Sequence, residues 1–395
     1  MKFEGLLKIT FWKVVAVVLM AAGLVSAIQR FAMGLGATTN LLDTFPWGIW
    51  IGVDILVGVG LAAGGFAIAA TVYIFNLERF RPILRPTILT AFLGYVLVIC
   101  GLMVDLGRPW AIWHAIIMWN PHSVMFEVAW CVMLYTTVLA LEFSPVVLEH
   151  FRLHRALKVV KAITIPLVVL GVVLSTLHQS SLGSLFLIIP SRMHPLWYSN
   201  IIPFLFIISC VAAGLAMTIF ESLISSRAFG REVELPFLTD IAKVVVVVLG
   251  LYFTVRMQDL MSRDALRYVF QWSYQSAMFM VEIVLGVILP FTLLLFRKVR
   301  SSKTWLFYSS TLVLLGFVAH RVNTAVTSME RWPERVYIPS IQEVSITAGL
   351  FAFGFLAFGF VARYFRVFGE EPHDAHSGET AGVRTAAAIP VTGMK

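Results

Sequence analysis

Long apolar runs separated by short polar segments make up almost the whole chain. At about 1.5 Å per helical residue, roughly 20 residues cross the hydrocarbon core of a bilayer. Backbone groups inside a bilayer must bond to one another, so the runs predict a bundle of membrane helices. The ten predicted spans are residues 14–29, 47–75, 87–104, 123–141, 159–177, 201–220, 242–255, 276–296, 305–320 and 341–362.

Two of these runs depart from the simple pattern. Residues 47–75 are nearly thirty in number with one charge, Asp54, so we expect a tilted helix or a re-entrant start at Pro46. Residues 242–255 form the shortest run. Composition agrees with a membrane protein, because 59% of the 395 residues are hydrophobic and 13% are charged, and the mean hydropathy is +0.86. The predicted fold class is an all-α integral membrane protein with ten transmembrane helices.

Basic residues predict the orientation of the bundle. An even number of spans puts both termini on one side, and if that side is the cytoplasm, 21 of the 30 Lys and Arg residues lie there. Positive charge gathers on the cytoplasmic side of membrane proteins. We therefore expect both termini in the cytoplasm and a disordered cytoplasmic tail over residues 370–395. The formal net charge of +8 then needs no nucleic acid as a partner.

Four spans recur in the same order, which predicts an internal repeat. The pairs are "FPWGIW" with "HPLWYS", "GLMVDLGRP" with "GLYFTVRMQDL", "HSVMFEVAW" with "YQSAMFMVEIV", and "STLHQSSLGS" with "VAHRVNTAVTS". An offset of four spans makes the copies parallel, so we expect two parallel-repeat four-helix bundles plus two peripheral helices. The predicted divisions are residues 1–46 (first helix and outer loop), 47–194 and 195–340 (the bundles), 341–369 (last helix) and 370–395 (tail).

Ionisable residues inside the predicted spans gather near the outer ends. Such residues usually face a bundle interior or a cavity and mark a pathway. Asp54, Glu127 and Glu282 lie one to two turns inside, where a buried structural hydrogen bond is the alternative explanation. For Asp105 with Arg108, and for His320 with Arg321, the alternative is solvation among lipid headgroups.

Two glutamates stand near opposite ends of one predicted span. Glu127 and Glu142 are fifteen residues apart, which places them roughly 22 Å apart along a helix. No single proton transfer covers that distance. Water or the side chains of Tyr135, Thr136 and Thr137 must fill the gap. Glu221 is a second carboxylate near an inner end.

A quinone fits this chemistry. Its carbonyl oxygens accept hydrogen bonds from His or Gln, and its two-electron reduction needs two protons, which carboxylic acids and histidine supply. Cys100, Cys131 and Cys210 have no cluster-ligand spacing, so we expect no iron–sulphur cluster in this chain. We also expect no haem, for which His178 and His320 are the only plausible ligand pair.

Several motifs resemble the NrfD or polysulphide-reductase membrane-subunit family, and within it the ten-helix HybB type of periplasmic nickel–iron hydrogenases. They are "FPWGIWIGVDILVGVG", "GGFAIAATVYIFN", "NPHSVMFEVAWC", "ALEFSP", "LHQSSLGSL" and "HPLW", and the similarity covers about residues 30–360. The resemblance implies a cofactor-free subunit of a bacterial inner (cytoplasmic) membrane that exchanges electrons between a periplasmic iron–sulphur partner and the quinone pool. It implies that Glu127 and His178 belong to the quinone site or the proton path.

We therefore interpret the chain as a quinone-interacting electron-transfer subunit of an oxidoreductase complex, with menaquinone or ubiquinone as substrate and nickel–iron hydrogenase subunits as partners. A transporter or ion channel without redox chemistry is the alternative. The predicted catalytic residues are Glu127, His178 and Asp105; the predicted quinone-binding residues are His178, Gln179, Arg108 and Glu127; the predicted proton path contains Asp54, Glu142, Glu221 and Glu282.

Overall fold

Long helical segments cross the described part of the protein from end to end. The computed structural model describes residues 10–43, 45, 47–230, 232–233, 235–331, 334, 336–365 and 367–368. Within these residues, ten helical segments are long and apolar enough to cross a membrane. The ten predicted spans and the all-α class are thereby confirmed. Pro46 and the predicted tail, residues 370–395, lie outside the described residues.

The spans contain one to three helices each. In chain order they are α1 (Phe11–Met33); η2 (Trp50–Ile55), α3 (Leu56–Leu61) and α4 (Gly64–Tyr73); η3 (Glu78–Phe80) and α5 (Arg81–Asp105); α7 (Val124–His150); α9 (Thr164–Ser184) and η5 (Leu185–Ile188); α10 (Ile202–Phe229); α11 (Leu235–Ser262); α12 (Tyr274–Ile283), η7 (Val284–Ile288) and α13 (Leu289–Leu295); α15 (Lys303–Ala325) and η8 (Thr327–Met329); α16 (Ile341–Tyr364). The connecting helices are α2 (Leu35–Thr38), η4 (Pro109–Ala111), α6 (His114–Ile117), α8 (His154–Ala162), η6 (Leu266–Phe270) and α14 (Arg297–Arg300).

The two spans that looked unusual have different explanations. The second begins with a π-helical turn, Trp50–Ile55, and the helix is interrupted again between Leu61 and Gly64. Widened turns of this kind often occur at functional sites, and this one carries Asp54. The seventh span is much longer than its apolar core, because α11 continues through polar residues at both ends to cover Leu235–Ser262.

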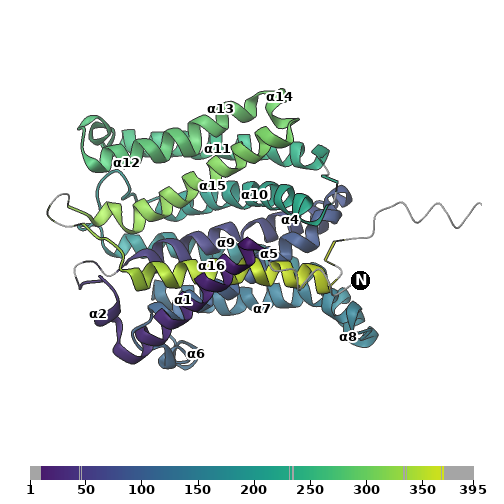
Figure 1. Ribbon diagram of the computed structural model, residues 1–395. Coiled ribbons are helices and arrows are strands. Elements are labelled where there is room, and N and C mark those ends of the chain that lie inside the picture. The colour runs from purple at the N-terminus through teal and green to yellow at the C-terminus, as the bar shows by residue number, and fades with distance from the viewer. Residues whose placement is uncertain are drawn as a thin grey trace, which may run out of the picture.

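The connections divide the molecule into two ends. We call one the long-loop end, with residues 34–43, 45, 47–49, 106–123, 189–201, 263–273, 330–331, 334 and 336–340, and the other the basic end, with residues 74–77, 151–163, 296–302, 365 and 367–368. The two ends lie on opposite sides of Figure 1, with α2, α6 and the start of α12 at the long-loop end and α8 and α14 at the basic end.

Eight of the spans form two rings of four. In the first ring α4, α5, α7 and α9 contact one another in turn, and in the second α10, α11, α13 and α15 do so. Figure 1 shows α11, α12 and α13 on one side of the molecule and α5 and α7 on the other. Helix α10 joins the rings through contacts with α9 and α4. That the rings arose from a sequence repeat stays a prediction.

Glycines allow close helix crossings at several places among the described residues. A Cβ on Gly64 would lie 2.6 Å from the carbonyl oxygen of Gly214, where the two rings meet. Gly286 and Gly316 make an equally close crossing within the second ring, and Gly23 and Gly349 do so between α1 and α16. Small residues let membrane helices approach until their backbones touch, which strengthens dispersion contacts.

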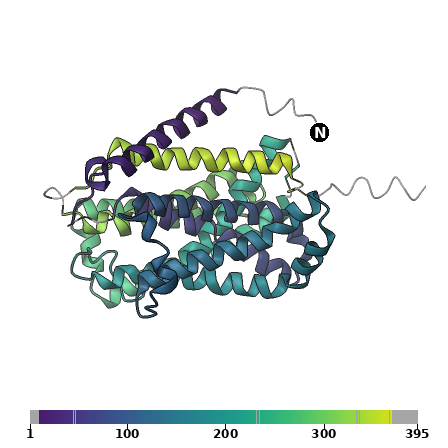
Figure 2. The ribbon, with the colours of Figure 1, turned by 90° about the horizontal axis from the view of Figure 1, so that it is seen from below.

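The first and last spans form a pair outside the rings. Helices α1 and α16 pack against each other, and α16 also contacts α5. Figure 2 shows both on one side of the remaining helices, with α1 the outermost. This pair closes over the long-loop end of the first ring, where Asp54 and Asp105 lie.

Candidate functional site

His178 and Gln179 occupy adjacent buried positions on α9. Oη of Tyr95 on α5 lies 2.8 Å from His178 Nδ1. Gln179 Oε1 accepts a hydrogen bond of 3.3 Å from Nη2 of Arg321 on α15. The Nε2 atoms of His178 and Gln179 have no hydrogen-bond partner among the described residues. Because buried polar atoms are normally paired, these two nitrogens are candidate contacts for a ligand or for water.

Glu127 connects this part of α9 to the outside of the bundle. It lies in the first turn of α7 and is exposed. Its Oε2 accepts a hydrogen bond of 2.9 Å from Ser181 Oγ. Ser181 follows His178 by three residues, so the two side chains lie on one side of α9. The structure thus brings Glu127 to the same helix face as His178.

The second ring contains a paired carboxylate. Glu282 Oε1 lies 2.9 Å from His320 Nδ1. Its Oε2 accepts hydrogen bonds of 2.9 Å from Trp197 Nε1 and from Asn323 Nδ2. All four side chains are buried. With three partners, Glu282 has the hydrogen bonds that a structural buried carboxylate requires, which favours the alternative explanation for this residue.

Two arginines are also buried in the second ring. Arg321 stacks on Phe206, with its Cζ 3.5 Å from the ring centroid, and its Nη2 also donates to Ser209 Oγ at 3.2 Å. Arg256 Nη2 donates to the carbonyl oxygen of Leu196 at 2.7 Å. The ion pairs of the described residues include neither arginine.

Asp54 and Asp105 form a separate group under the α1–α16 pair. Asp54 accepts a hydrogen bond of 2.8 Å from Thr347 Oγ1 of α16. Asp105 lies near Arg30, whose Nε donates to the backbone carbonyl one residue before Asp105. Arg108, which was predicted to bind the quinone, is exposed. The predicted site residues therefore do not all come together in one place.

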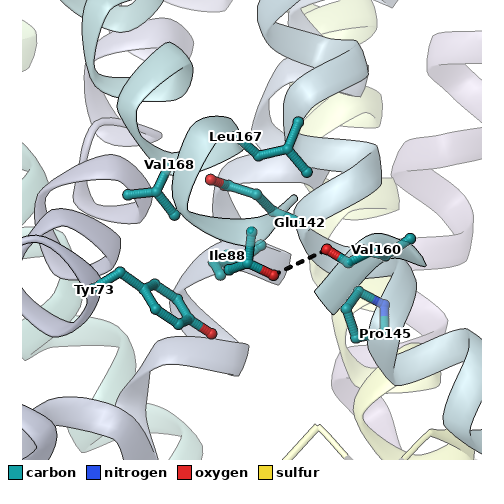
Figure 3. A pocket seen from close by; sticks show the side chains of 8 residues that line it. Tyr73, Ile88, Glu142, Pro145, Val160, Leu167 and Val168 are labelled. Atoms are coloured by element: carbon teal, nitrogen blue, oxygen red, sulfur yellow. Dashed lines mark hydrogen bonds between the residues drawn. The ribbon is translucent and has the colours of Figure 1, made fainter. Parts of the chain in front are cut away.

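Glu142 lies near the basic end, in a pocket of its own. Figure 3 shows its side chain between those of Leu167 and Val168, with Tyr73 across the pocket. The same side chain reaches to within 3.5 Å of the Cβ position of Gly171. Glu142 thus has access to a cavity near the predicted cytoplasmic surface.

Glu221 is a second carboxylate toward the basic end. It lies on α10 beside Thr90 of α5, and its Oε1 has no hydrogen-bond partner among the described residues. It does not line the pocket of Glu142.

One residue of α7 points into the gap between Glu142 and His178. Tyr135 is fully buried and packs edge-on against Tyr95, with ring centroids 4.7 Å apart. Thr136 and Thr137 bond back to carbonyl oxygens of their own helix. Tyr135 is therefore the one of the three candidates that faces the interior.

Sequence reasoning missed several partners of the predicted residues. Their common property is an ordinary residue type on a different span, so no local pattern marks them. They are Arg30, Tyr95, Ser181, Trp197, Asn323 and Thr347.

The family of this chain follows from its similarity to known proteins. Residues 37–328 match the model of the polysulphide reductase family, NrfD. The chain belongs to the NrfD family. Among its relatives, a protein of Nitratidesulfovibrio vulgaris is 38% identical over 378 residues, which cover 91% of this chain and 95% of the relative. The expected family is therefore confirmed.

Two other relatives carry descriptive names. The "probable Ni/Fe-hydrogenase 2 b-type cytochrome subunit" of Escherichia coli K12 is 31% identical, over 90% of this chain and 92% of the relative. The "menaquinone reductase, integral membrane subunit" of Nitratidesulfovibrio vulgaris is 28% identical, over 93% and 94%.

The cytochrome name raises the question of haem. The described residues contain no group of three or more His, Cys, Asp or Glu side chains that could hold a metal ion. A b-type haem needs two facing histidines. His178 is in contact with α5 of the first ring, whereas His320 is paired with α12 of the second. That this chain holds no haem stays a prediction.

Proposed function

We propose that this NrfD-family chain is the quinone-interacting electron-transfer subunit of a membrane redox complex. The observation that carries the proposal is the pair of buried, unpartnered Nε2 atoms on His178 and Gln179. A quinone carbonyl accepts hydrogen bonds from such nitrogens. Glu127, bonded to Ser181 on the same helix face, is an acid within reach of that region.

The partner is proposed from the relatives. Two of them are named as subunits of a nickel–iron hydrogenase and a menaquinone reductase. We therefore propose menaquinone or ubiquinone as the substrate. The proposed complex is an uptake hydrogenase that contains an iron–sulphur subunit. The partner docks at the long-loop end, on the periplasmic side of a bacterial inner membrane, because the site residues lie toward that end.

Protons reach the site along the first ring in this proposal. Glu142 takes a proton from the pocket at the basic end, and Tyr135 and Tyr95 continue the route to His178. Internal water completes the contacts that these side chains do not make directly. Each two-electron reduction of quinone consumes two protons, so protons from the cytoplasm and electrons from the periplasm make turnover electrogenic.

The remaining predicted residues have secondary roles in this proposal. Asp105 with Arg30, and Asp54 with Thr347, form a polar group beside the site under α16. Glu221 offers a second proton entry from the basic end. Glu282 is proposed to act mainly as a structural anchor, because it has three hydrogen-bond partners.

The first test is the turnover of two variants in the intact complex. His178→Ala and Glu127→Gln are expected to lower quinone turnover about 100-fold, the usual size of a positioned proton donor. His154→Ala, at an exposed histidine of the basic end, is the matched control. Normal turnover in both variants, together with ion transport by the isolated chain in liposomes, would instead establish the transporter alternative.

A further inference from the structure

Four nitrogen atoms around His178 and Gln179 lack hydrogen-bond partners among the described residues. They are Nε2 of His178, Nε2 of Gln179, and Nε and Nη1 of Arg321. All three side chains are at most 1% exposed. A buried polar atom without a partner is costly, so a group of four is a strong sign that another molecule supplies acceptors here.

The chemistry of Arg321 fixes the orientation of Gln179. A guanidinium group has donors and no acceptor, so the amide atom that faces Nη2 must be the oxygen. The amide nitrogen of Gln179 then points away from Arg321 with both of its hydrogens available. Arg321 is itself held by Ser209 and by the face of Phe206.

Tyr95 fixes the tautomer of His178 in a similar way. The phenol is the better donor of the two groups, so the hydroxyl of Tyr95 donates to Nδ1 and that nitrogen accepts. The single proton of the neutral imidazole then lies on Nε2, the atom without a partner. Both residues thus become donors through neighbours on other helices.

We propose that Tyr95 and Arg321 are positioning residues for the quinone: each occupies the acceptor atom of its neighbour, and so aims an N–H of His178 and of Gln179 at a quinone carbonyl. The proposal rests on the quinone site proposed above and adds that the second ring, through α15, is part of it. Arg321 has no carboxylate in ion-pair contact among the described residues, so its charge also favours an oxygen that gains negative charge on reduction.

The test is binding of menadione to the purified complex, with one carbonyl carbon labelled with 13C. Infrared difference spectra report the hydrogen bond to that carbonyl, and a titration gives the Kd without turnover. In Tyr95→Phe and Arg321→Lys the carbonyl band is expected to move toward that of free menadione, and the Kd to rise about tenfold. Tyr252→Phe and Arg256→Lys remove a buried phenol hydroxyl and a buried guanidinium from the second ring, and both are expected to bind as wild type.

Gln179→Glu tests the orientation without loss of the contact to Arg321. The new carboxylate pairs with the guanidinium, so the thermal unfolding temperature is expected to stay equal or to rise, while the carbonyl band shift and tight binding are lost. Wild-type binding by Gln179→Glu would overturn the proposal, and this variant decides the matter if Arg321→Lys does not fold.

Two further variants, His178→Ala and Gln179→Ala, separate this inference from the function on which it rests. If His178→Ala loses binding while Tyr95→Phe and Arg321→Lys behave as wild type, the site stands and the positioning roles are wrong. If His178→Ala and Gln179→Ala both bind menadione normally, the quinone site is elsewhere and both proposals fail.

Discussion

Buried polar side chains find their partners far away in the sequence. Ser181 lies 54 residues from Glu127, Arg321 lies 142 from Gln179, and Asp54 bonds a threonine 293 residues away. Depth within a span could be predicted from the sequence, because each helix rises by a constant amount per residue. The partners could not, because they depend on the rotation of each helix and on which helices touch. The depth of each candidate site residue was thus predictable, and its pairing was not.

At the scale of single residues, substitution of Glu142 tests the proposed proton route most directly. In Glu142→Gln, quinone turnover in proteoliposomes is expected to lose its dependence on membrane potential, because the amide cannot carry a proton from the pocket at the basic end. Turnover is measured with and without an imposed potential.

Glu149→Gln is the matched control for that experiment. Glu149 lies two turns further along α7, where it pairs with Arg85 at 2.9 Å and Lys161 at 3.4 Å on the surface. Its variant is expected to respond to the potential as wild type does. An unchanged response in Glu142→Gln would remove that residue from the route.

At the scale of whole helices, apolar length predicted every span but not its internal shape. The π-helical turns Trp50–Ile55 and Val284–Ile288 leave no mark in the hydropathy pattern. Nor did the pattern predict α8, a separate helix of nine residues that overlaps the beginning of the predicted span 159–177. Widened turns arise from tertiary packing, which sequence periodicity does not record. The glycine crossings belong to the same class of feature.

A valine at Gly64 is expected to destabilise the contact between the rings. Its Cβ would lie 2.6 Å from the backbone oxygen of Gly214 and 2.8 Å from Thr218 Oγ1, so the helices must separate. We expect a loss of roughly 1–3 kcal/mol, the usual cost of overpacking. Thermal unfolding in detergent measures it.

Gly359→Val controls for the change of residue type. Gly359 lies in α16, and a Cβ there would meet nothing within 4 Å. Its unfolding temperature is expected to match that of the wild type. Equal loss in both variants would mean that the close crossing does not hold the rings together.

The whole molecule has two chemically different ends, and this difference predicts its orientation. Basic residues such as Arg155, Lys158 and Lys298 lie at the basic end, whereas the residues around His178 lie toward the long-loop end. The positive-inside rule puts the basic end in the cytoplasm. The proposed redox partner then meets the protein from the opposite side.

Cysteine labelling tests this orientation. Ser191 and Ser301 are exposed residues at the long-loop and basic ends. In intact spheroplasts a membrane-impermeant maleimide is expected to label Ser191→Cys and to leave Ser301→Cys unlabelled. The three native cysteines lie inside spans, so the wild-type chain is the blank. The reverse labelling pattern would invert the proposed topology.

The pairing of α1 with α16 has a consequence for biosynthesis. Gly23 cannot contact Gly349 until 326 more residues have been synthesised, which takes roughly 15–65 s at about 5–20 residues per second. Arg30 finds its acceptor, the carbonyl oxygen of Val104, as soon as α5 is made. Asp54 has no such early partner, because its hydrogen-bond donor is Thr347 of the last span. The nascent protein therefore keeps an unsatisfied carboxyl group in the bilayer until its last span arrives. A membrane-integrated chaperone or protease that surveys such groups would distinguish finished from truncated chains by this carboxyl group.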